Sequence, residues 1–180
     1  IIIGGPGPNT YELDKYIGLI IDVGGNDLYR GMIASSVNEE QGNAVVIDLN
    51  GDDTYAGAPL GLATGRLGVG LLIDHDGDDV YQLGMGSGGA GIGGLGILFD
   101  TNGDDVYMGN RLTQGAAIGG LGLLLDAAGN DRYTSHGFAI EILQRLLGEA
   151  GEPLDWRYTD SSQALAALHA GHADVASLHL

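Results

Sequence analysis

The stretch Leu72-Ile-Asp-His-Asp-Gly-Asp-Asp-Val-Tyr81 is one of five variants of a single motif in this chain. Every variant has Asp at its third position, Gly at its sixth, Asp at its eighth and Tyr at its tenth. The other four variants occupy residues 20–29, 46–55, 98–107 and 124–133. Successive copies are 26 residues apart at every step, without an insertion. A period that is constant to the residue is the signature of a repeat architecture.

Each 26-residue unit combines a short apolar strand that ends in Asp, a Gly-containing turn, a shorter strand that ends in Tyr, and a Gly-rich return. Glycine and short apolar runs oppose helix formation. We therefore predict a mainly β fold, a parallel β-solenoid over residues 1–137, with the five 26-residue coils at about residues 17–137. Equivalent residues of neighbouring coils would lie about 4.8 Å apart, which also predicts a ladder of stacked tyrosines in the core. A β-propeller is the competing architecture, but its blades usually need about 40 residues or more.

Glycine distribution gives an independent prediction. All but three of the 34 glycines precede residue 138. In strand interiors each would cost about 0.5–1 kcal/mol, and the total would exceed the stability of about 5–15 kcal/mol that is typical of a domain. We therefore expect most of them at corners with positive φ, or where neighbouring coils pass too closely for a Cβ atom.

Stacking of the copies predicts two columns of carboxylates. The first column contains Asp22, Asp48, Asp74, Asp100 and Asp126, and the second contains Asp27, Asp53, Asp79, Asp105 and Asp131. Two unit charges about 4.8 Å apart repel by about 3.5 kcal/mol at an effective dielectric constant of about 20. The basic residues before residue 138 are too few to neutralise both columns: Lys15, Arg30, Arg66, Arg111 and Arg132. The columns must therefore bind metal, become protonated or splay into water.

Calcium is the metal that these side chains favour, because they offer hard oxygen ligands, no Cys and few His. The predicted Ca²⁺ ligands are Asp22, Asp27, Asp48, Asp52, Asp53, Asp74, Asp76, Asp78, Asp79, Asp100, Asp104, Asp105, Asp126 and Asp131. Two alternatives remain open. Asp and Asn next to Gly also cap turns without a metal, and a pair of Asp residues could serve a polysaccharide-active enzyme. His75 and Asp76, which occur in one copy only, are the candidate catalytic residues of that enzyme.

The turn segments resemble half of the nonapeptide glycine-aspartate repeat of calcium-binding RTX β-rolls. The segments that carry this resemblance are Gly25-Asn26-Asp27, Gly51-Asp52-Asp53, Gly77-Asp78-Asp79, Gly103-Asp104-Asp105 and Gly129-Asn130-Asp131. It covers about nine residues of every 26. It implies that turn carbonyls and an Asp from each coil hold Ca²⁺ between coils. The chain departs from the RTX pattern in its period and in having Asp in place of the leading Gly.

The repeat period ends near Gly137, since Glu152 stands where the next Asp is due. Residues 138–180 instead contain apolar residues at helical spacing and strand-like segments, with Ser and Gly at the expected helix ends. They predict a second domain, a small α/β segment after the solenoid.

The segment Ser162-Gln-Ala-Leu-Ala-Ala-Leu-His-Ala-Gly-His-Ala-Asp-Val-Ala-Ser-Leu-His-Leu180 resembles part of a periplasmic-binding-protein-like domain of the kind found in molybdate-responsive and molybdenum-cofactor-associated proteins. The resemblance implies that Ser161 and Ser162 lie at a helix N-terminus and face an anionic ligand. A further hypothesis is a metal site shared by His169, His172 and His179.

Composition excludes several classes of function. The chain has 24 acidic and 7 basic side chains, a formal charge of −17. It has no electrostatic attraction for nucleic acid or anionic lipid and no apolar stretch of membrane-spanning length, so we expect neither nucleic-acid binding nor membrane insertion. The absence of Cys excludes disulfides and thiol chemistry. Because the sequence begins with Ile1 and not Met, we expect a signal peptide to be missing from it.

We therefore expect a non-enzymatic, calcium-binding repeat domain of a bacterial extracellular or cell-surface protein, with a structural or adhesive role. A surface polysaccharide or another protein is the expected partner. The alternative is a module that binds a small anion or other small ligand through the C-terminal segment and uses the repeats as a scaffold.

Overall fold

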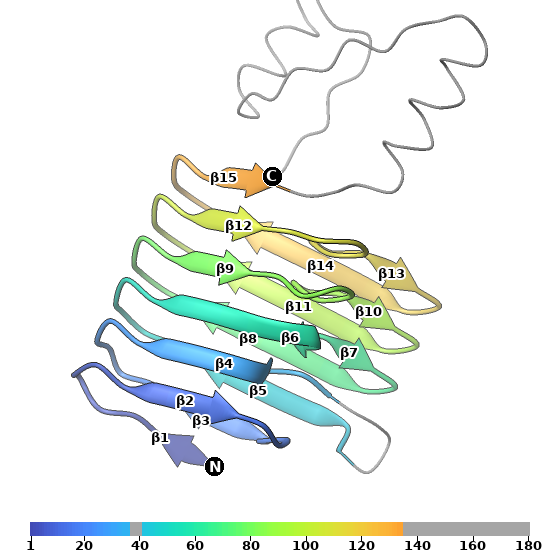
Figure 1. Ribbon diagram of the computed structural model, residues 1–180, viewed down its shortest axis with the longest axis horizontal. Coiled ribbons are helices and arrows are strands. Elements are labelled where there is room, and N and C mark those ends of the chain that lie inside the picture. Colours follow the sequence, from blue (N-terminus) through green and yellow to red (C-terminus); the bar gives the residue numbers. More distant parts are fainter. Residues whose placement is uncertain (37–40, 135–180) are drawn as a thin grey trace, which may run out of the picture. The chain divides into compact units, whose positions relative to one another are not determined.

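The computed structural model describes residues 1–36 and 41–134, and these residues form a parallel β-solenoid (Figure 1). The predicted mainly β fold with coils of 26 residues is confirmed. The described residues contain no helix with the length and apolar character of a membrane span. The α/β segment predicted for 138–180 lies outside the described residues.

Three sheets run along the described part of the solenoid. Sheet A contains β1 (Ile2–Ile3), β3 (Leu19–Ile21), β5 (Asn43–Ile47), β8 (Val69–Asp74), β11 (Leu95–Asp100) and β14 (Leu121–Asp126). Sheet B contains β2 (Thr10–Leu13), β4 (Leu28–Ile33), β6 (Thr54–Leu62), β9 (Val80–Gln82), β12 (Val106–Met108) and β15 (Arg132–Thr134). The short sheet C contains β7 (Gly65–Arg66), β10 (Gly91–Ile92) and β13 (Ala117–Ile118).

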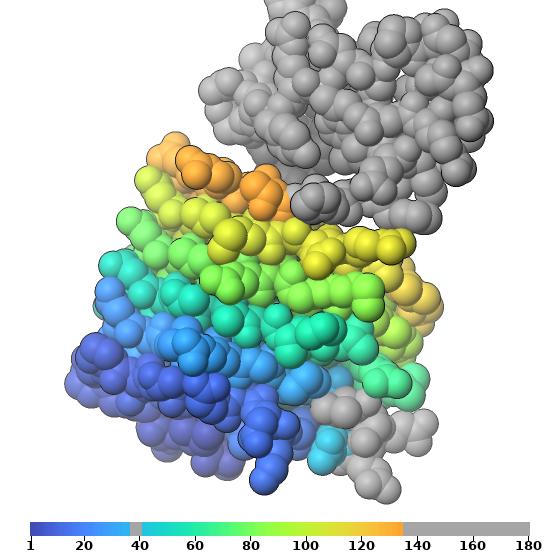
Figure 2. Space-filling model, viewed as in Figure 1, coloured from blue at the N-terminus to red at the C-terminus, as the bar shows by residue number. Residues whose placement is uncertain are grey.

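From β3 and β4 onward neighbouring coils pair in register, so that most strand residues lie beside their equivalent 26 positions along the chain; the register shifts once, between Gly31 and Ile33 of β4. Leu72 pairs with Leu98, and Tyr81 pairs with Tyr107. The backbone groups of one coil are therefore satisfied by the next coil, as buried polar groups must be. Figure 2 shows the coils as successive bands of chain. This parallel pairing excludes the competing β-propeller for the described residues.

Residues 2–13 form an additional coil that the 26-residue period did not identify. Strand β1 pairs with β3, and β2 pairs with β4, which places Tyr11 beside Tyr29. The offset between these two tyrosines is 18 residues and not 26. Gly4 also stands where the later coils have their first Asp, next to Asp22. The shorter return and the lost Asp hide this coil from a search at constant period.

The core consists of two ladders of side chains that point inward. The predicted tyrosine ladder is confirmed, and successive ring centroids are 4.6–4.9 Å apart along Tyr11, Tyr29, Tyr55, Tyr81, Tyr107 and Tyr133. Beside it lies an apolar ladder of fully buried side chains from sheet A: Ile20, Val46, Leu72 and Leu98. Burial of these large side chains, at about 1.5–3 kcal/mol each, is the main stabilising contribution of the interior.

Glycine at the corner after sheet A is required by the geometry. Gly51 and Gly77 have φ values of 140° and 154°, which side chains rarely adopt. A Cβ atom on Gly77 would also overlap the carbonyl oxygen of Gly51 in the preceding coil. The glycine positions predicted from conformational cost are confirmed at this corner.

We expect Gly77→Ala to lower the free energy of unfolding by about 1–3 kcal/mol, because the new methyl group forces neighbouring coils apart and the backbone into a strained conformation. Gly5→Ala is the matched control, since a Cβ atom there meets nothing within 4 Å. Urea denaturation of both variants measures the difference. Equal midpoints for the two variants would contradict this account of the corner.

Candidate metal centre

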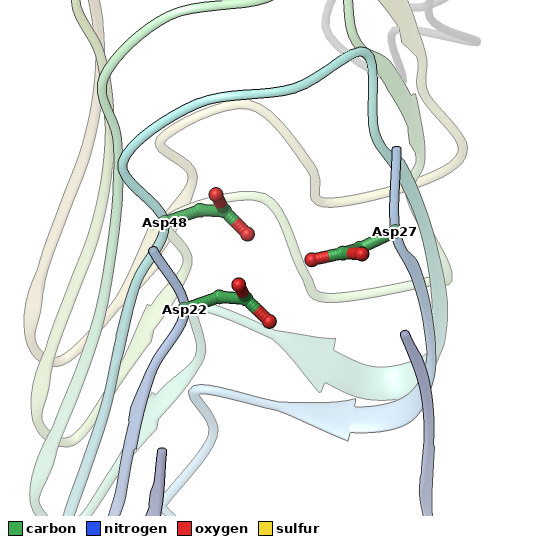
Figure 3. A group of neighbouring side chains, drawn as sticks. All are labelled: Asp22, Asp27 and Asp48. Carbon is green, nitrogen blue, oxygen red and sulfur yellow. The ribbon is translucent and has the colours of Figure 1, made fainter. Parts of the chain in front are cut away.

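The two Asp columns face each other across the inside of one corner of the solenoid. Asp22 directly follows β3, Asp27 directly precedes β4, and a short Gly-containing turn joins them. Side chains alternate along a strand, so Asp22 points inward with Ile20, and Asp27 points inward with Tyr29. Figure 3 shows Asp22 and Asp48, from consecutive coils, pointing toward Asp27 on the opposite side. The repeat thus places an Asp on each side of the corner in the five later coils, and the first coil has Gly4 and Asn9 at these positions.

The ten Asp residues of the two columns form four groups of three. In each group, one carboxyl oxygen from every member lies within 4.8 Å of the corresponding oxygens of the other two. The groups are Asp22, Asp27 and Asp48; Asp53, Asp74 and Asp79; Asp79, Asp100 and Asp105; and Asp105, Asp126 and Asp131. Ligands of one Ca²⁺ ion must lie within twice the Ca–O distance, or about 5 Å, of one another. The spacing of these oxygens meets that condition.

These carboxylates are not hydrated by bulk solvent. Eight of the ten are 0–3% exposed, and Asp126 and Asp131, on the last described coil, are half-buried. Of the three ways to relieve their repulsion, splaying into water is therefore excluded for the eight buried groups. Metal binding and protonation remain.

The first Asp column accepts hydrogen bonds from the tyrosine ladder. The hydroxyl of Tyr29 donates to Asp48 Oδ2 at 2.5 Å, so the bond joins one coil to the next. The same bond recurs from Tyr55 to Asp74 and from Tyr81 to Asp100. Each of these tyrosine hydroxyls therefore donates one hydrogen bond to its carboxylate, and the bond reaches only one of the two carboxyl oxygens.

The second Asp column accepts hydrogen bonds from the backbone. The amide of Asp27 donates to Asp53 Oδ1 at 2.7 Å, and the amide of Asp53 donates to Asp79 Oδ1 at 2.6 Å. The pattern continues to Asp105 and to Asp131. These bonds match the turn-capping alternative, with the difference that each side chain caps the turn of the preceding coil.

Asp22 and Asp48 have a donor at both oxygens, because their Oδ1 atoms accept the backbone amides of Gly24 at 3.0 Å and Asn50 at 3.2 Å. Other inner Asp residues keep one carboxyl oxygen without a donor. Within the described residues, the buried carboxyl oxygens that lack a hydrogen-bond partner are Asp27 Oδ2, Asp74 Oδ1, Asp100 Oδ1, Asp105 Oδ2 and Asp126 Oδ1, and the Tyr107 hydroxyl also lacks one. An unpaired buried carboxylate is strongly destabilising unless it is neutralised or bound to a cation. In each of these Asp side chains one carboxyl oxygen accepts a hydrogen bond, and the other requires a proton or a bound cation.

Asp53 and Asp79 also have one carboxyl oxygen, Oδ2, whose only donor is distant. The nearest donor to Asp79 Oδ2 is the Tyr81 hydroxyl at 3.5 Å, and that of Asp53 Oδ2 is the Tyr55 hydroxyl at 3.4 Å. A hydroxyl has a single proton, and each of these two donates it to the first-column Asp of the next coil.

Four of the predicted ligands belong to a different row. Asp52, Asp76, Asp78 and Asp104 are exposed on the outside of the turn and are not members of the four groups. The Asp78 carboxylate accepts the backbone amide of Asp104 at 2.9 Å, and Asp52 accepts that of Asp78 at 3.1 Å. This outer row therefore caps turns and remains solvated. His75 is also exposed, and its Nδ1 lies 3.3 Å from Thr101 Oγ1.

Burial raises the pKa values of six of the eight fully buried carboxyl groups, and neighbouring carboxylates raise them further. Backbone donors to the second column act in the opposite direction but are outweighed. The raised pKa values are about 6 for Asp27, about 7 for Asp74 and Asp100, about 8 for Asp105, about 9 for Asp53 and about 10 for Asp79. Burial also raises the pKa of the ladder tyrosines, which stay protonated donors. Without a cation, several inner carboxyl groups are therefore protonated near neutral pH.

Sequence reasoning placed the two columns but missed the partners of the first one. The signal was present in the spacing, because each of Tyr29, Tyr55 and Tyr81 precedes its bonded Asp by 19 residues. The role of Asn9 was also missed. Asn9 replaces the second Asp in the first coil, and its backbone N–H donates to Asp27 Oδ1 at 2.6 Å. The residues proposed for other sites lie outside the described part of the chain: Ser161, Ser162, His169, His172 and His179.

Comparison of the chain with protein-family models, with curated proteins and with solved structures finds no match.

We expect the metal-free protein to lose stability as pH rises. The six Asp residues with raised values have an ordinary pKa of about 3.8 when unfolded and values of about 6–10 when folded. Between these values the folded state binds more protons, so the free energy of unfolding falls with rising pH. This contribution is complete below pH 4 and is lost as pH passes through the folded values.

Chemical denaturation in the presence of a chelator, at intervals from pH 4 to pH 9, measures this dependence. A stability that stays constant or increases over this range would contradict the assignment of raised pKa values to the inner columns.

Proposed function

We propose that this chain is a structural, calcium-loaded β-solenoid of a secreted or surface-exposed protein, similar in principle to RTX repeats. The observation that carries the proposal is the set of four groups of three carboxylates, each of which contains at least one buried carboxyl oxygen without a hydrogen-bond donor. A divalent cation in each group would satisfy these oxygens and remove the repulsion between coils.

The donor set favours Ca²⁺ over other biological cations. Zinc and other transition metals are usually held by nitrogen or sulfur ligands, and the four groups contain only carboxylates. Mg²⁺ usually keeps several waters of its hydration shell, which a group with side chains 0–3% exposed does not readily accommodate. Ca²⁺ accepts oxygen ligands in irregular geometry. The groups that would hold it are the four already described, with Asp79 and Asp105 each contributing to two of them.

The balance of charge in the corner also supports Ca²⁺ binding. Ten carboxylates line the corner, and four divalent cations would supply eight positive charges. Folding would then be coupled to the calcium concentration, because the unfolded chain has no preformed group of three carboxylates. Extracellular calcium modules typically bind in the range of about 10⁻⁴–10⁻³ M, which favours an extracytoplasmic setting where calcium is abundant.

Burial of the inner carboxylates favours a structural role over a catalytic one. The inner carboxylates are covered by the turn and by the ladders on either side, so a polymeric substrate could not reach them. Repetition of one arrangement in every coil also fits a spacing or adhesive function. A surface polysaccharide or a protein remains the partner that we propose for such a role.

We expect calcium to stabilise the solenoid at neutral and alkaline pH. At a free concentration of about 100 times Kd, each site would add about 2.7 kcal/mol to the free energy of unfolding. Thermal unfolding followed by far-UV circular dichroism, in 10 mM CaCl₂ and in chelator at pH 7.5, measures the effect, and 10 mM MgCl₂ is the control for ionic strength. Unchanged unfolding in calcium would contradict the proposal.

Asp79→Asn provides the test of the site itself, because Asp79 belongs to two groups. The amide keeps an oxygen that can cap the Asp53 backbone amide but lacks the charge. In chelator at pH 7.5 we expect the variant to be about as stable as the natural chain, because Asp79, with its pKa of about 10, is already protonated there. In calcium we expect it to gain less stability, because the amide cannot become a charged ligand.

The matched control is Asp78→Asn, which removes the same charge from the exposed neighbour outside the four groups. We expect its response to calcium to equal that of the natural chain. If both variants responded alike, the outer row or general charge screening would explain the stabilisation, and the inner site would be wrong.

A further inference from the structure

The outer face of sheet A is apolar along its described strands. Burial alternates in β8 and β11, where every second side chain points inward and is covered. The remaining side chains of these two strands face outward and are all apolar: Val69, Leu71, Ile73, Leu95, Ile97 and Phe99. Sheet A is therefore apolar on both faces near its centre, except for the inward Asp at each strand end.

In-register pairing joins these outward side chains into continuous ladders. Leu71 pairs with Val45 of the preceding coil and with Ile97 of the next. In strands β3, β5, β8, β11 and β14 no outward side chain is charged, and Asn43 is the single polar one. Since 17% of the chain is charged, a flat surface of this extent without any charge is a specific feature of this face.

The solvent-facing side of sheet B differs from that of sheet A, because it has charged and polar side chains. There Glu12 and Arg30 form an ion pair at 3.0 Å, and Gln82 is exposed. Figure 2 views the molecule from this side, with β4, β6 and β9 in front. Parallel strands with uninterrupted apolar residues are typical of sheets that are covered on both faces. Sheet A has this composition, and the described residues cover its inner face only.

We propose that the outer face of sheet A is a homodimer interface, occupied by the same face of a second copy of this chain. The surface is flat and consists of repeated ladders, so it is self-complementary, as a two-fold interface requires. Two sheets can pack face to face at about 10 Å through such side chains.

Charge selects the orientation of the two copies. The exposed Asp52, Asp76 and Asp78 follow the C-terminal ends of the sheet A strands, so they lie along one edge of the face. A two-fold axis parallel to the solenoid axis reverses the strand direction and places the acidic edges of the two copies on opposite sides. An axis along the strands would place both acidic edges together, which the net charge of −17 disfavours.

The area of the outer face of sheet A determines how strongly two copies are expected to associate. The 28 residues of the six strands, at about 3.3 Å each along the strand and about 4.8 Å between strands, give a face of roughly 450 Å² for each copy. Two copies would bury about 900–1,000 Å² in total, which is at the lower limit for a specific interface and typical of weak, reversible association. The dimer should therefore dissociate at micromolar concentrations.

Sedimentation velocity of the full chain from about 1 to 300 µM, at 150 mM NaCl in calcium, tests the proposal. We expect the mass to rise from 18.5 kDa toward twice that value. Leu71→Lys, at the centre of the face, should remain monomeric over the whole range. Leu71→Thr, a polar but β-forming replacement that keeps the fold if the lysine does not, should weaken association about tenfold.

Gln82→Lys is the control, because it introduces the same charge on the exposed side of sheet B. It should dimerise as the natural chain does, and circular dichroism establishes that each variant is folded. A natural chain that stays monomeric at 300 µM would overturn the proposal. A loss of association in Gln82→Lys as large as that in Leu71→Lys would overturn it too.

Discussion

In-register stacking of identical coils is the constraint on which the rest of the structure depends. It places every side chain beside a copy of itself, as the pairs Leu72–Leu98 and Tyr81–Tyr107 show. For apolar and aromatic side chains this repetition is favourable, because each copy covers the next. For Asp it is unfavourable, since like charges are held at the distance between coils. The chain therefore contains a stabilising core and a destabilising corner that arise from the same repeat.

The tyrosine ladder links these two parts. Its rings stack in the core, and the hydroxyls of Tyr29, Tyr55 and Tyr81 each reach the first-column Asp of the following coil. The second column is fixed from the other direction, because its Asp side chains accept backbone amides of the preceding coil. Asp74 and Asp100 in the first column and Asp27 and Asp105 in the second are thus held by one oxygen, and their second oxygen has no donor. Asp22 and Asp48 differ, because a backbone amide also reaches their other oxygen. This division explains why turn capping alone does not account for the corner.

The sequence predicted the coil and both columns because their residues recur at one spacing. It also predicted the stacking of tyrosines such as Tyr81, since stacking follows directly from the period. It did not separate Asp78 from Asp79, because the conformation of the turn decides which of two adjacent side chains points inward. The coil of residues 2–13 was missed because its return is shorter and Gly4 has replaced the Asp. The bond from Tyr81 to Asp100 recurs at a constant spacing of 19 residues, but the spacing alone does not show that the hydroxyl reaches the carboxylate across the corner.

The central claim is that cations bind to the oxygens that converge in groups of three. Crystals grown in calcium, with diffraction data collected for anomalous scattering, test this claim most directly. The account predicts anomalous peaks inside the corner, about 2.3–2.6 Å from oxygens of groups such as Asp79, Asp100 and Asp105. Absence of these peaks, with opposed carboxyl oxygens about 2.5–2.7 Å apart and sharing a proton, would contradict it.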